Sequence, residues 1–364
     1  MSWAVERARF PVLERHAYLN AGTFGPLARD TIEATAELEA WEAEHGRGGR
    51  AYFDAMLERR ERVRALVAAE VGVGADRVAL TSSTTQGVHI VLAGLPLGPD
   101  DEIVTTDHEH FGLTGPLVAT GAGVRVARLR PLPAAEAFDA IRAEVTPRTK
   151  LIALSHVSWI DGRVLPCAEL RVATGVPVLV DGAQSAGAIH VDAGAVDFYT
   201  VSAQKWLCAP AGTGALVVRD PDALRMTLVA YPSQQAYSIE EATFEPKPGA
   251  ARFDPGFAPP AALAGLEAAL TRLPDGRYER ARELTERFRE ALAEAGHDVV
   301  TEPRQGTLVT WRSPGDTAAT AAALYERGVV LRDLPGAGLL RASVGWWNDE
   351  TDLERLLDAL AAVG

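Results

Sequence analysis

The sequence has few of the features that mark secreted, membrane-spanning or metal-binding proteins. It contains two cysteines, Cys167 and Cys208, which are too few for a disulfide framework, and no group of Cys and His has zinc-site spacing. The first residues are charged and form no apolar signal segment, and no apolar run is long enough to cross a membrane. We therefore expect a soluble cytoplasmic enzyme without a bound metal.

The chain also has an excess of negative charge. Its 36 Lys and Arg residues stand against 49 Asp and Glu residues, which gives a formal net charge of −13. This balance argues against nucleic acids and anionic membranes as partners, because both attract basic surfaces. A chain of 364 residues is long enough to bury one large core and a smaller one.

Apolar segments with the length of strands alternate with helical segments through the first part of the chain. This alternation predicts an α/β fold with a mostly parallel sheet that is covered by helices on both faces. The expected strands cover residues 78–81, 102–106, 124–129, 150–154, 176–180, 198–202 and 214–219, and one of the last two is expected to be antiparallel. The expected helices cover residues 85–95, 112–120, 134–144 and 168–174.

The composition changes at residues 246–260, which are rich in Pro and Gly and are interpreted as a linker with functional loops. Leu353, Leu356, Leu357 and Leu360 repeat at helical spacing near the C-terminus. The expected elements after the linker are helices at 261–273, 276–295 and 350–363 and strands at 306–311 and 339–344. They predict a second, smaller α/β domain.

A lysine and an aspartate follow two of the expected strands. Lys205 stands in Ser-Ala-Gln-Lys-Trp after strand 198–202, and Asp181 begins Asp-Gly-Ala-Gln after strand 176–180. Strand ends are a usual place for ligand contacts in α/β sheets. An amine there can form a Schiff base with the aldehyde of pyridoxal phosphate (PLP), while a carboxylate keeps the pyridine nitrogen protonated. Taken singly, Lys205 could be a surface lysine and Asp181 a turn residue.

With these two motifs, the chain resembles the class V aminotransferase family of fold-type I PLP enzymes, which includes cysteine desulfurases, selenocysteine lyases and isopenicillin N epimerase-like proteins. The resemblance extends from Tyr18 to the C-terminus. It implies a large PLP-binding domain at 22–250 with a mostly parallel seven-stranded sheet, and a small domain formed by 1–21 and 251–364. It also implies a homodimer that acts on a small-molecule amino acid, with active sites near the subunit interface.

The resemblance assigns roles to individual residues. Those implied to bind the cofactor are Thr84, Thr85, His110, Asp181, Gln184, Ser202, Gln204 and Lys205. The implied catalytic residues are Lys205, Asp181 and His110, and the implied substrate-binding residues are Arg341, Asn20 and Trp159. Arginine suits carboxylate binding because its planar guanidinium can donate two parallel hydrogen bonds.

Several of these residues have simpler explanations. The hydroxyl-rich run at 81–85 would also serve as a helix N-cap, and Arg341 could form a surface ion pair. His108 and His110 form an H-x-H pattern beside two acids, which is weak evidence for a metal. The family resemblance instead implies that His110 stacks on the pyridine ring, and it gives His108 no role.

The chain departs from the desulfurase pattern at three places. The loop at 332–340, where desulfurases carry a nucleophilic cysteine, has none, and Trp159 stands where Asn is frequent. Phe257 replaces a residue that contacts the partner subunit's cofactor phosphate. We therefore expect a C–S lyase of the cysteine/selenocysteine lyase type without a persulfide cysteine. Transamination and epimerisation remain as alternatives, because they use the same residues.

Overall fold

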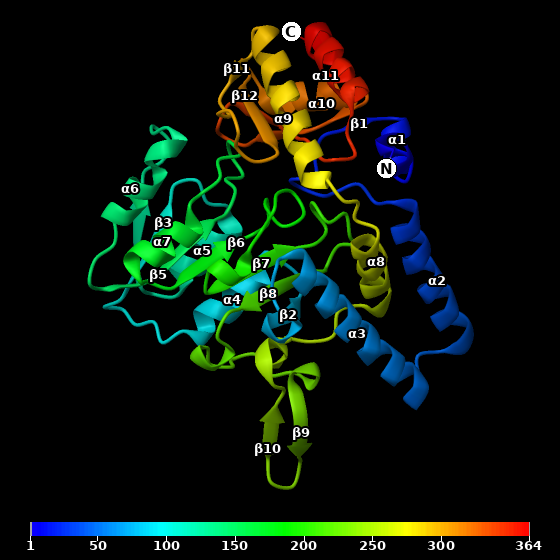
Figure 1. Ribbon diagram of the computed structural model, residues 1–364, viewed down its shortest axis with the longest axis vertical. Helices are drawn as coiled ribbons and strands as arrows, with labels where there is room; N and C mark the ends of the chain where they lie inside the picture. Colours follow the sequence, from blue (N-terminus) through cyan, green and yellow to red (C-terminus); the bar gives the residue numbers. More distant parts are fainter. Residues whose placement is uncertain (1, 364) are drawn as a thin grey trace.

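The computed structural model describes residues 2–363, and a seven-stranded sheet forms its centre (Figure 1). The strand order is β2-β8-β7-β6-β5-β3-β4. The strands are β2 (Val78–Thr81), β3 (Glu102–Thr106), β4 (Gly123–Ala127), β5 (Thr149–Ser155), β6 (Val178–Asp181), β7 (Phe198–Ser202) and β8 (Gly214–Val218). Strand β8 is antiparallel to both of its neighbours, while β3 to β7 run parallel. The sheet therefore has the predicted, mostly parallel form.

The central strands are buried on both faces, which explains why they appear in the sequence as nearly continuous apolar runs. Two apolar clusters lie against the sheet, one with residues of α3, α6, α7 and α8, and the other with residues of α4 and α5. These helices are α3 (Arg50–Glu70), α4 (Thr84–Gly94), α5 (Phe111–Ala119), α6 (Ala137–Ala143), α7 (Cys167–Thr174) and α8 (Pro260–Thr271). Helix α2 (Arg29–His45) packs along α8.

The smaller domain lies above the carboxyl ends of the central strands in Figure 1. Its sheet has the order β11-β12-β15-β14, and its helices are α9 (Arg277–Glu294), α10 (Thr317–Tyr325) and α11 (Glu350–Val363). The strands are β11 (Asp298–Val299), β12 (Leu308–Arg312), β14 (Arg332–Leu334) and β15 (Leu339–Ser343). One apolar cluster with Phe288, Trp311 and Leu356 forms its core.

The N-terminal segment packs against this smaller domain. Strand β1 (Ala17–Tyr18) pairs in parallel with β13 (Val329–Val330), and Arg7 of α1 (Trp3–Arg7) forms an ion pair with Asp352 at 2.7 Å. The packing agrees with the implied role of residues 1–21, of which Met1 lies outside the described residues. Helix α8, by contrast, contributes Leu263 and Leu266 to the large-sheet core. A domain boundary after α8 is therefore favoured over one at residue 251, and the domain division remains a prediction.

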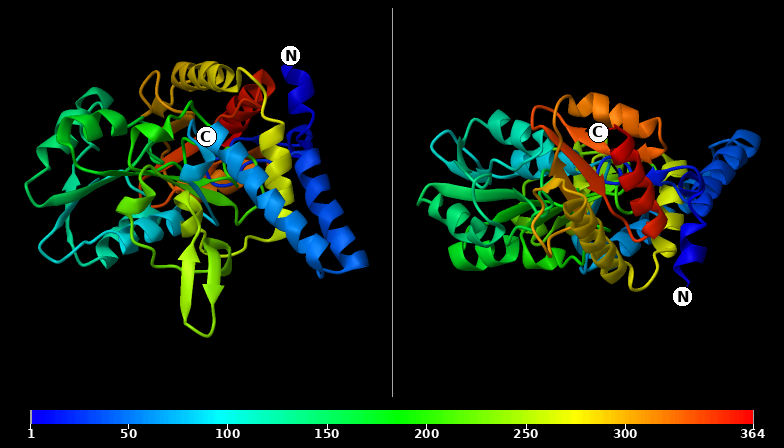
Figure 2. Two further views of the ribbon diagram at one scale, coloured as in Figure 1. Left: turned by 60° about the horizontal axis from the view of Figure 1, so that its bottom comes forward. Right: turned by 90° about the horizontal axis from the view of Figure 1, so that it is seen from above.

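The segment expected to be a linker, residues 246–260, follows a β-hairpin and contains one short 3-10 turn. Strands β9 (Gln234–Ser238) and β10 (Thr243–Pro246) form a hairpin that projects from the molecule in Figures 1 and 2. A 3-10 turn (Gly249–Phe253) follows, and Asp254 then accepts buried ion pairs from Arg60 and Arg64, each at 2.8 Å. The carboxylate of Asp254 therefore fixes this segment to α3.

Within residues 2–363, no helix is both long and apolar enough to cross a membrane. The same part of the chain contains no group of three or more His, Cys, Asp or Glu residues placed to hold a metal ion.

Candidate active site

A cavity of about 150 Å³, which we call the inner cavity, lies where β5, β6 and β7 end and α4 begins. Parallel strands of an open α/β sheet end at the edge where such folds bind their ligands. The inner cavity brings together residues from five separate segments of the sequence. It is lined by Ser83, Thr84, Thr85, His110, Ser155, Val157, Trp159, Asp181, Ala183, Gln184, Ser202, Gln204 and Lys205.

Lys205 and Asp181 lie on neighbouring parts of the inner cavity, as the ends of β6 and β7 predict. Asp181 is buried, and its Oδ1 accepts a hydrogen bond from the Ala183 N–H at 2.9 Å. Burial lowers the pKa of Lys205 to about 8; Asp181 opposes this shift, while Arg341 and Arg332 add to it. Lys205 is therefore partly neutral near physiological pH, and a neutral amine is the form that attacks an aldehyde or accepts a proton.

The N-terminus of α4 forms one end of the inner cavity. Ser83 caps the helix by accepting a hydrogen bond from the Gln86 N–H, and Thr84 and Thr85 occupy its first turn. Helix N-termini bind phosphate because free N–H groups and the helix dipole favour an anion. Gly87 allows α4 to lie this close to β7, because a Cβ there would come within 2.7 Å of the Thr200 side chain.

His110 caps the start of α5 with its ring. Its Nδ1 accepts a hydrogen bond from the Gly112 N–H at 3.0 Å, so the proton of the neutral ring is on Nε2. The ring packs edge-on against Trp159, with centroids 5.2 Å apart. Partial burial and the charge of Lys205 lower the pKa of His110, which favours the neutral imidazole. A neutral ring suits stacking on a cofactor better than a cation does.

Gln184 is held more firmly than the sequence indicated. Its Nε2 donates to the Gly22 carbonyl at 2.8 Å, and its Oε1 accepts from Trp206 Nε1 at 3.0 Å. Only one amide N–H of Gln184 remains for the ring hydroxyl of a cofactor.

Arg341 and Asn20 do not line the inner cavity, and Arg341 contacts the cavity wall at Trp159. Arg341 is 1% exposed, and its Nη1 donates to the Trp159 carbonyl at 2.7 Å. Nε and Nη2 of Arg341 and Oδ1 of Asn20 are buried without a hydrogen-bond partner in the described chain. Burial, with a contribution from Arg332, lowers the pKa of Arg341 to about 9. A guanidinium left with two free donors at this depth fits a carboxylate ligand.

Two further residues at the site were missed by the sequence analysis. Arg332 of β14 is the direct cross-strand partner of Arg341, so both side chains are on the same face of the small sheet. Glu109, between the two histidines, accepts hydrogen bonds from the side chains of Thr106 and Ser155 at 2.6 and 2.5 Å. Burial raises the pKa of Glu109 to about 7. Arg332 could have been found from its position nine residues before Arg341, at the start of the segment that leads into β15.

His108 has a structural place outside the inner cavity. Its Nδ1 lies 3.1 Å from Ser158 Oγ and 3.5 Å from a carboxylate oxygen of Asp161. The H-x-H pattern therefore divides between a buried structural histidine and an active-site histidine.

The inner cavity fits PLP in its donor chemistry. It offers an amine at Lys205, a carboxylate at Asp181 and a helix N-terminus, and Gln204 Oε1 and Trp159 Nε1 are buried there without a hydrogen-bond partner. Unpaired buried polar atoms are uncommon in folded proteins and are explained when a ligand supplies the partner.

Neither cysteine belongs to the inner cavity. Cys167 begins α7, and Cys208 follows Lys205 by three residues, but both thiols are buried among apolar side chains. Burial raises the pKa of both thiols, which disfavours the reactive thiolate.

The chain is similar in sequence and structure to known proteins. The family model Aminotransferase class-V matches residues 18–356. Isopenicillin N epimerase of Streptomyces clavuligerus is 30% identical, with 99% of this chain and 98% of the relative covered. A probable cysteine desulfurase of Xylella fastidiosa is 29% identical, with 99% and 95% covered.

Among solved structures, a complex of the cystine C–S lyase C-DES with its reaction product cysteine persulfide aligns with a TM-score of 0.89. That protein is 29% identical, and the alignment covers 97% of this chain and 99% of C-DES. A second C-DES structure, with glycine covalently linked to its PLP cofactor, has a TM-score of 0.91 at 29% identity and covers 98% of this chain and 99% of that chain.

Proposed function

Because this chain belongs to the class V aminotransferase family and is a PLP-dependent enzyme acting on amino acids, we propose that it is a C–S lyase. In this reaction it would cleave the bond between the β-carbon and sulfur of a sulfur-containing amino acid and release the sulfur species directly. The observation that carries the proposal is that no thiol lies at the inner cavity. A cysteine desulfurase must pass sulfur to a protein thiolate, and this chain has none in place to receive it.

The structural likeness to C-DES supports the same conclusion. The loop between β14 and β15, at residues 335–338, contains only Pro, Gly and Ala. A sulfur atom that leaves the substrate would therefore depart as a free thiol or persulfide.

The residues in and beside the inner cavity would each have a separate role in this reaction. Bound PLP supplies the electron sink for the electron pair left when a bond at the substrate α-carbon breaks. Lys205 would hold the cofactor in the resting enzyme and then accept the α-proton at Nζ. Asp181 would keep the ring nitrogen protonated, and Nε and Nη2 of Arg341 would bind the substrate carboxylate.

The proposed reaction is a β-elimination followed by hydrolysis. The Cα–H bond breaks and its proton passes to Lys205, and the Cβ–S bond breaks with its electron pair leaving on sulfur. Water then hydrolyses the remaining three-carbon unit to pyruvate and ammonia.

Amino-acid epimerisation is the second candidate, because isopenicillin N epimerase matches this chain over nearly its full length. Epimerisation requires an acid on the face of the substrate opposite Lys205 to return a proton. His110 is the group at the inner cavity with a donor N–H suited to that task.

The experiment that separates the two functions offers L-cystine, L-cysteine and L-alanine to the PLP-loaded protein. A lyase yields pyruvate and ammonia in equal amounts together with a sulfur product. An epimerase yields the D-isomer by chiral chromatography without pyruvate, and that result would refute the lyase proposal. Borohydride reduction and peptide mapping should place the trapped cofactor on Lys205, and label on another lysine would contradict the site.

A homodimer is the third part of the proposal. Tyr231, Tyr237, Ile239 and Phe244, on and beside the β9–β10 hairpin, are between 45% and 83% exposed. The hairpin projects from the molecule (Figure 2), and exposed apolar side chains gathered on such a projection are typical of a protein-contact surface. We propose that a second copy covers it, and that the enzyme works in the cytoplasm, where unpaired cysteines stay reduced.

Light scattering should give twice the chain mass for the wild type. The double substitution Tyr237→Lys, Ile239→Lys should shift the protein towards the monomer, while Val172→Lys, at an equally exposed apolar residue on α7, serves as the control. A wild-type protein that is monomeric and fully active would contradict the dimer.

A further inference from the structure

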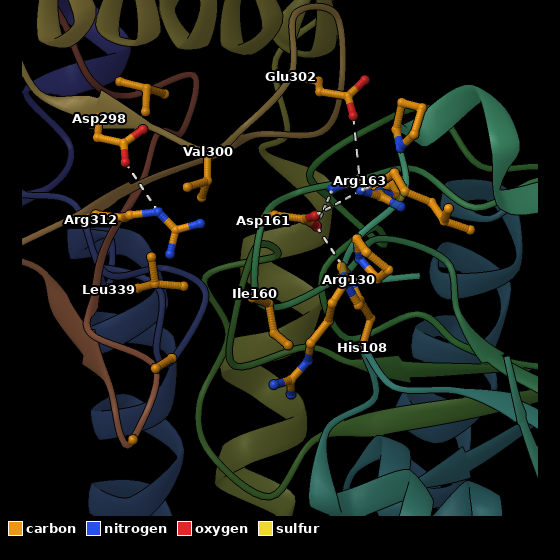
Figure 3. A pocket seen from close by; sticks show the side chains of 16 residues that line it. His108, Arg130, Ile160, Asp161, Arg163, Asp298, Val300, Glu302, Arg312 and Leu339 are labelled. Carbon is orange, nitrogen blue, oxygen red and sulfur yellow. Dashed lines mark hydrogen bonds and ion pairs between the residues drawn. The ribbon is translucent and has the colours of Figure 1, made fainter. Parts of the chain in front are cut away.

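A second and larger cavity, which we call the outer cavity, lies between the two domains (Figure 3). Its volume is about 550 Å³. It is lined from the large domain by His108, residues 130–133 and Ile160, Asp161 and Arg163, and from the small domain by residues 298–300, Glu302, Arg312, Gly336, Ala337 and Leu339. No residue assigned above to the cofactor lines it.

The outer cavity adjoins the inner cavity along shared segments of chain. Trp159 lines the inner cavity and the next residue, Ile160, lines the outer one. Leu339 and Arg341 are two residues apart on β15 and therefore point to the same face of that strand. One strand face thus runs from the wall of the outer cavity to the guanidinium proposed to bind the substrate carboxylate.

The inner cavity is too small for a long substrate. Pockets that enclose a drug-sized ligand have volumes of roughly 300–1,000 Å³. The inner cavity, at about 150 Å³, is below this range and has to hold the cofactor as well, whereas the outer cavity, at about 550 Å³, falls within it. The part of a substrate beyond sulfur must therefore extend out of the inner cavity.

Arg130 is the cation in the outer cavity without an acidic partner. Arg312 pairs with Asp298 at 3.1 Å, and Arg163 lies 3.4 Å from a carboxylate oxygen of Asp161. Arg130 donates only to the Asp107 carbonyl, at 3.2 Å, and pairs with no carboxylate within residues 2–363. In Figure 3 its side chain extends past Ile160, away from the paired charges.

The other walls suit the middle of an extended ligand. Ile160, Val300 and Leu339 present apolar side chains, and Arg163 Nε and His108 Nε2 are buried at the lining without hydrogen-bond partners in the described residues. The outer cavity therefore combines an apolar passage with an unpaired cation and further polar atoms.

We propose that the outer cavity binds the distal part of the substrate and that Arg130 binds a carboxylate at its far end. The inference rests on the proposed C–S lyase function and narrows its substrate class. The preferred substrates are disulfide or thioether amino acids whose leaving group carries a second carboxylate, as in L-cystine. Amino acids with a small leaving group fill only the inner cavity.

The test compares L-cystine with β-chloro-L-alanine, which undergoes elimination at the same carbons but loses only chloride. Arg130→Gln should lower kcat/KM for L-cystine by about 10- to 100-fold, the effect of one charged hydrogen-bonded contact. The value for β-chloro-L-alanine should stay within about twofold, because that substrate does not reach Arg130.

Two further variants act as controls. Arg128→Gln removes an exposed arginine of the same loop, and Arg128 does not line the outer cavity. This variant should leave kcat/KM unchanged for both substrates. Arg332→Gln removes the neighbour of Arg341 and should affect both substrates. Thermal melting of each variant establishes that it is folded.

Three results would overturn the outer-cavity proposal. The first is an equal fall in kcat/KM for both substrates in Arg130→Gln, and the second is no fall for either substrate. The third is a fall in kcat/KM for L-cystine in Arg128→Gln. Calorimetric measurement of the binding of the two compounds to the PLP-loaded protein distinguishes failure of the outer-cavity proposal from failure of the lyase proposal. If the wild type eliminates neither compound, the lyase proposal fails. In that case weaker binding of L-cystine alone in Arg130→Gln supports the outer-cavity site, and unchanged binding refutes it.

Discussion

Replacement of Arg341 by lysine provides a stringent test of the substrate geometry. One edge of the guanidinium is already used, because Nη1 donates to the Trp159 carbonyl at 2.7 Å. The remaining Nε and Nη2 are buried and unpaired, and they form the edge that binds a carboxylate by two parallel hydrogen bonds. Lysine would keep the charge but could not hold Trp159 and a carboxylate in the same way.

The size of the effect follows from these two contacts. A hydrogen bond between charged groups contributes about 1.5–3 kcal/mol, and two coupled ones lost from a partly desolvated site should cost about 2–4 kcal/mol. At about 1.4 kcal/mol per factor of ten, kcat/KM should fall roughly 30- to 1,000-fold. In Arg341→Ala, kcat/KM should fall at least as far, because this variant also removes the hydrogen bond to the Trp159 carbonyl.

The assay is steady-state release of pyruvate, with cofactor content measured from the yellow absorbance of the bound PLP. We expect both variants to keep the cofactor, since Arg341 does not line the inner cavity. Ile32→Ala, at a half-exposed apolar residue of α2 outside that cavity, is a control for general loss of packing. Wild-type kinetics in a fully loaded Arg341→Lys enzyme would show that the substrate carboxylate binds elsewhere.

Three other predictions follow from buried charges and thiols. The pKa of Lys205 is lowered to about 8, so the rate at which the apoenzyme takes up PLP should rise with pH and level off above about pH 8. Asp181→Asn should move the midpoint of this rise to lower pH, because Asp181 raises the pKa of Lys205. A rate that is flat between pH 6.5 and 9 would contradict the shift. The double variant Cys167→Ser, Cys208→Ser should retain most of its activity, and a folded, yellow but inactive protein would make one cysteine catalytic. Asp254→Asn should lower the free energy of unfolding in urea by about 3–5 kcal/mol, because two buried arginines lose their carboxylate. The control, Asp222→Asn, at an exposed ion pair, should leave the urea midpoint of unfolding unchanged.

The sequence could predict the part of the site that the large sheet builds. Lys205 and Asp181 follow apolar runs that are buried on both faces, and such runs are visible without a structure. Because parallel strands end at one edge, residues that follow them must converge. The inner cavity contains every residue implied to bind the cofactor, and their individual roles stay predictions until variants are made.

The elements that were missed have weak periodic signals. Helix α2 is rich in Ala and Glu and α3 is rich in Arg and Ala, and one residue of α2 and five of α3 are buried, so their apolar stripes are narrow. The carboxylate of Asp254 stabilises a segment that composition alone predicted to be a linker with functional loops. An ion pair between residues 190 positions apart leaves no local pattern.

The substrate side of the site depends on contacts between domains, which explains why sequence reasoning reached less of it. Arg341 of the small domain donates to the Trp159 carbonyl of the large domain, and Thr310 Oγ1 donates to the carbonyl of the next residue, Ile160, at 2.7 Å. These two hydrogen bonds fix the turn that separates the inner from the outer cavity. Arg130 comes from the loop after β4, and Arg332 comes from β14 beside Arg341, so the packing of the domains brings Arg332 to that turn. Cofactor chemistry can therefore be predicted from strand ends, whereas specificity follows from the relative position of the domains.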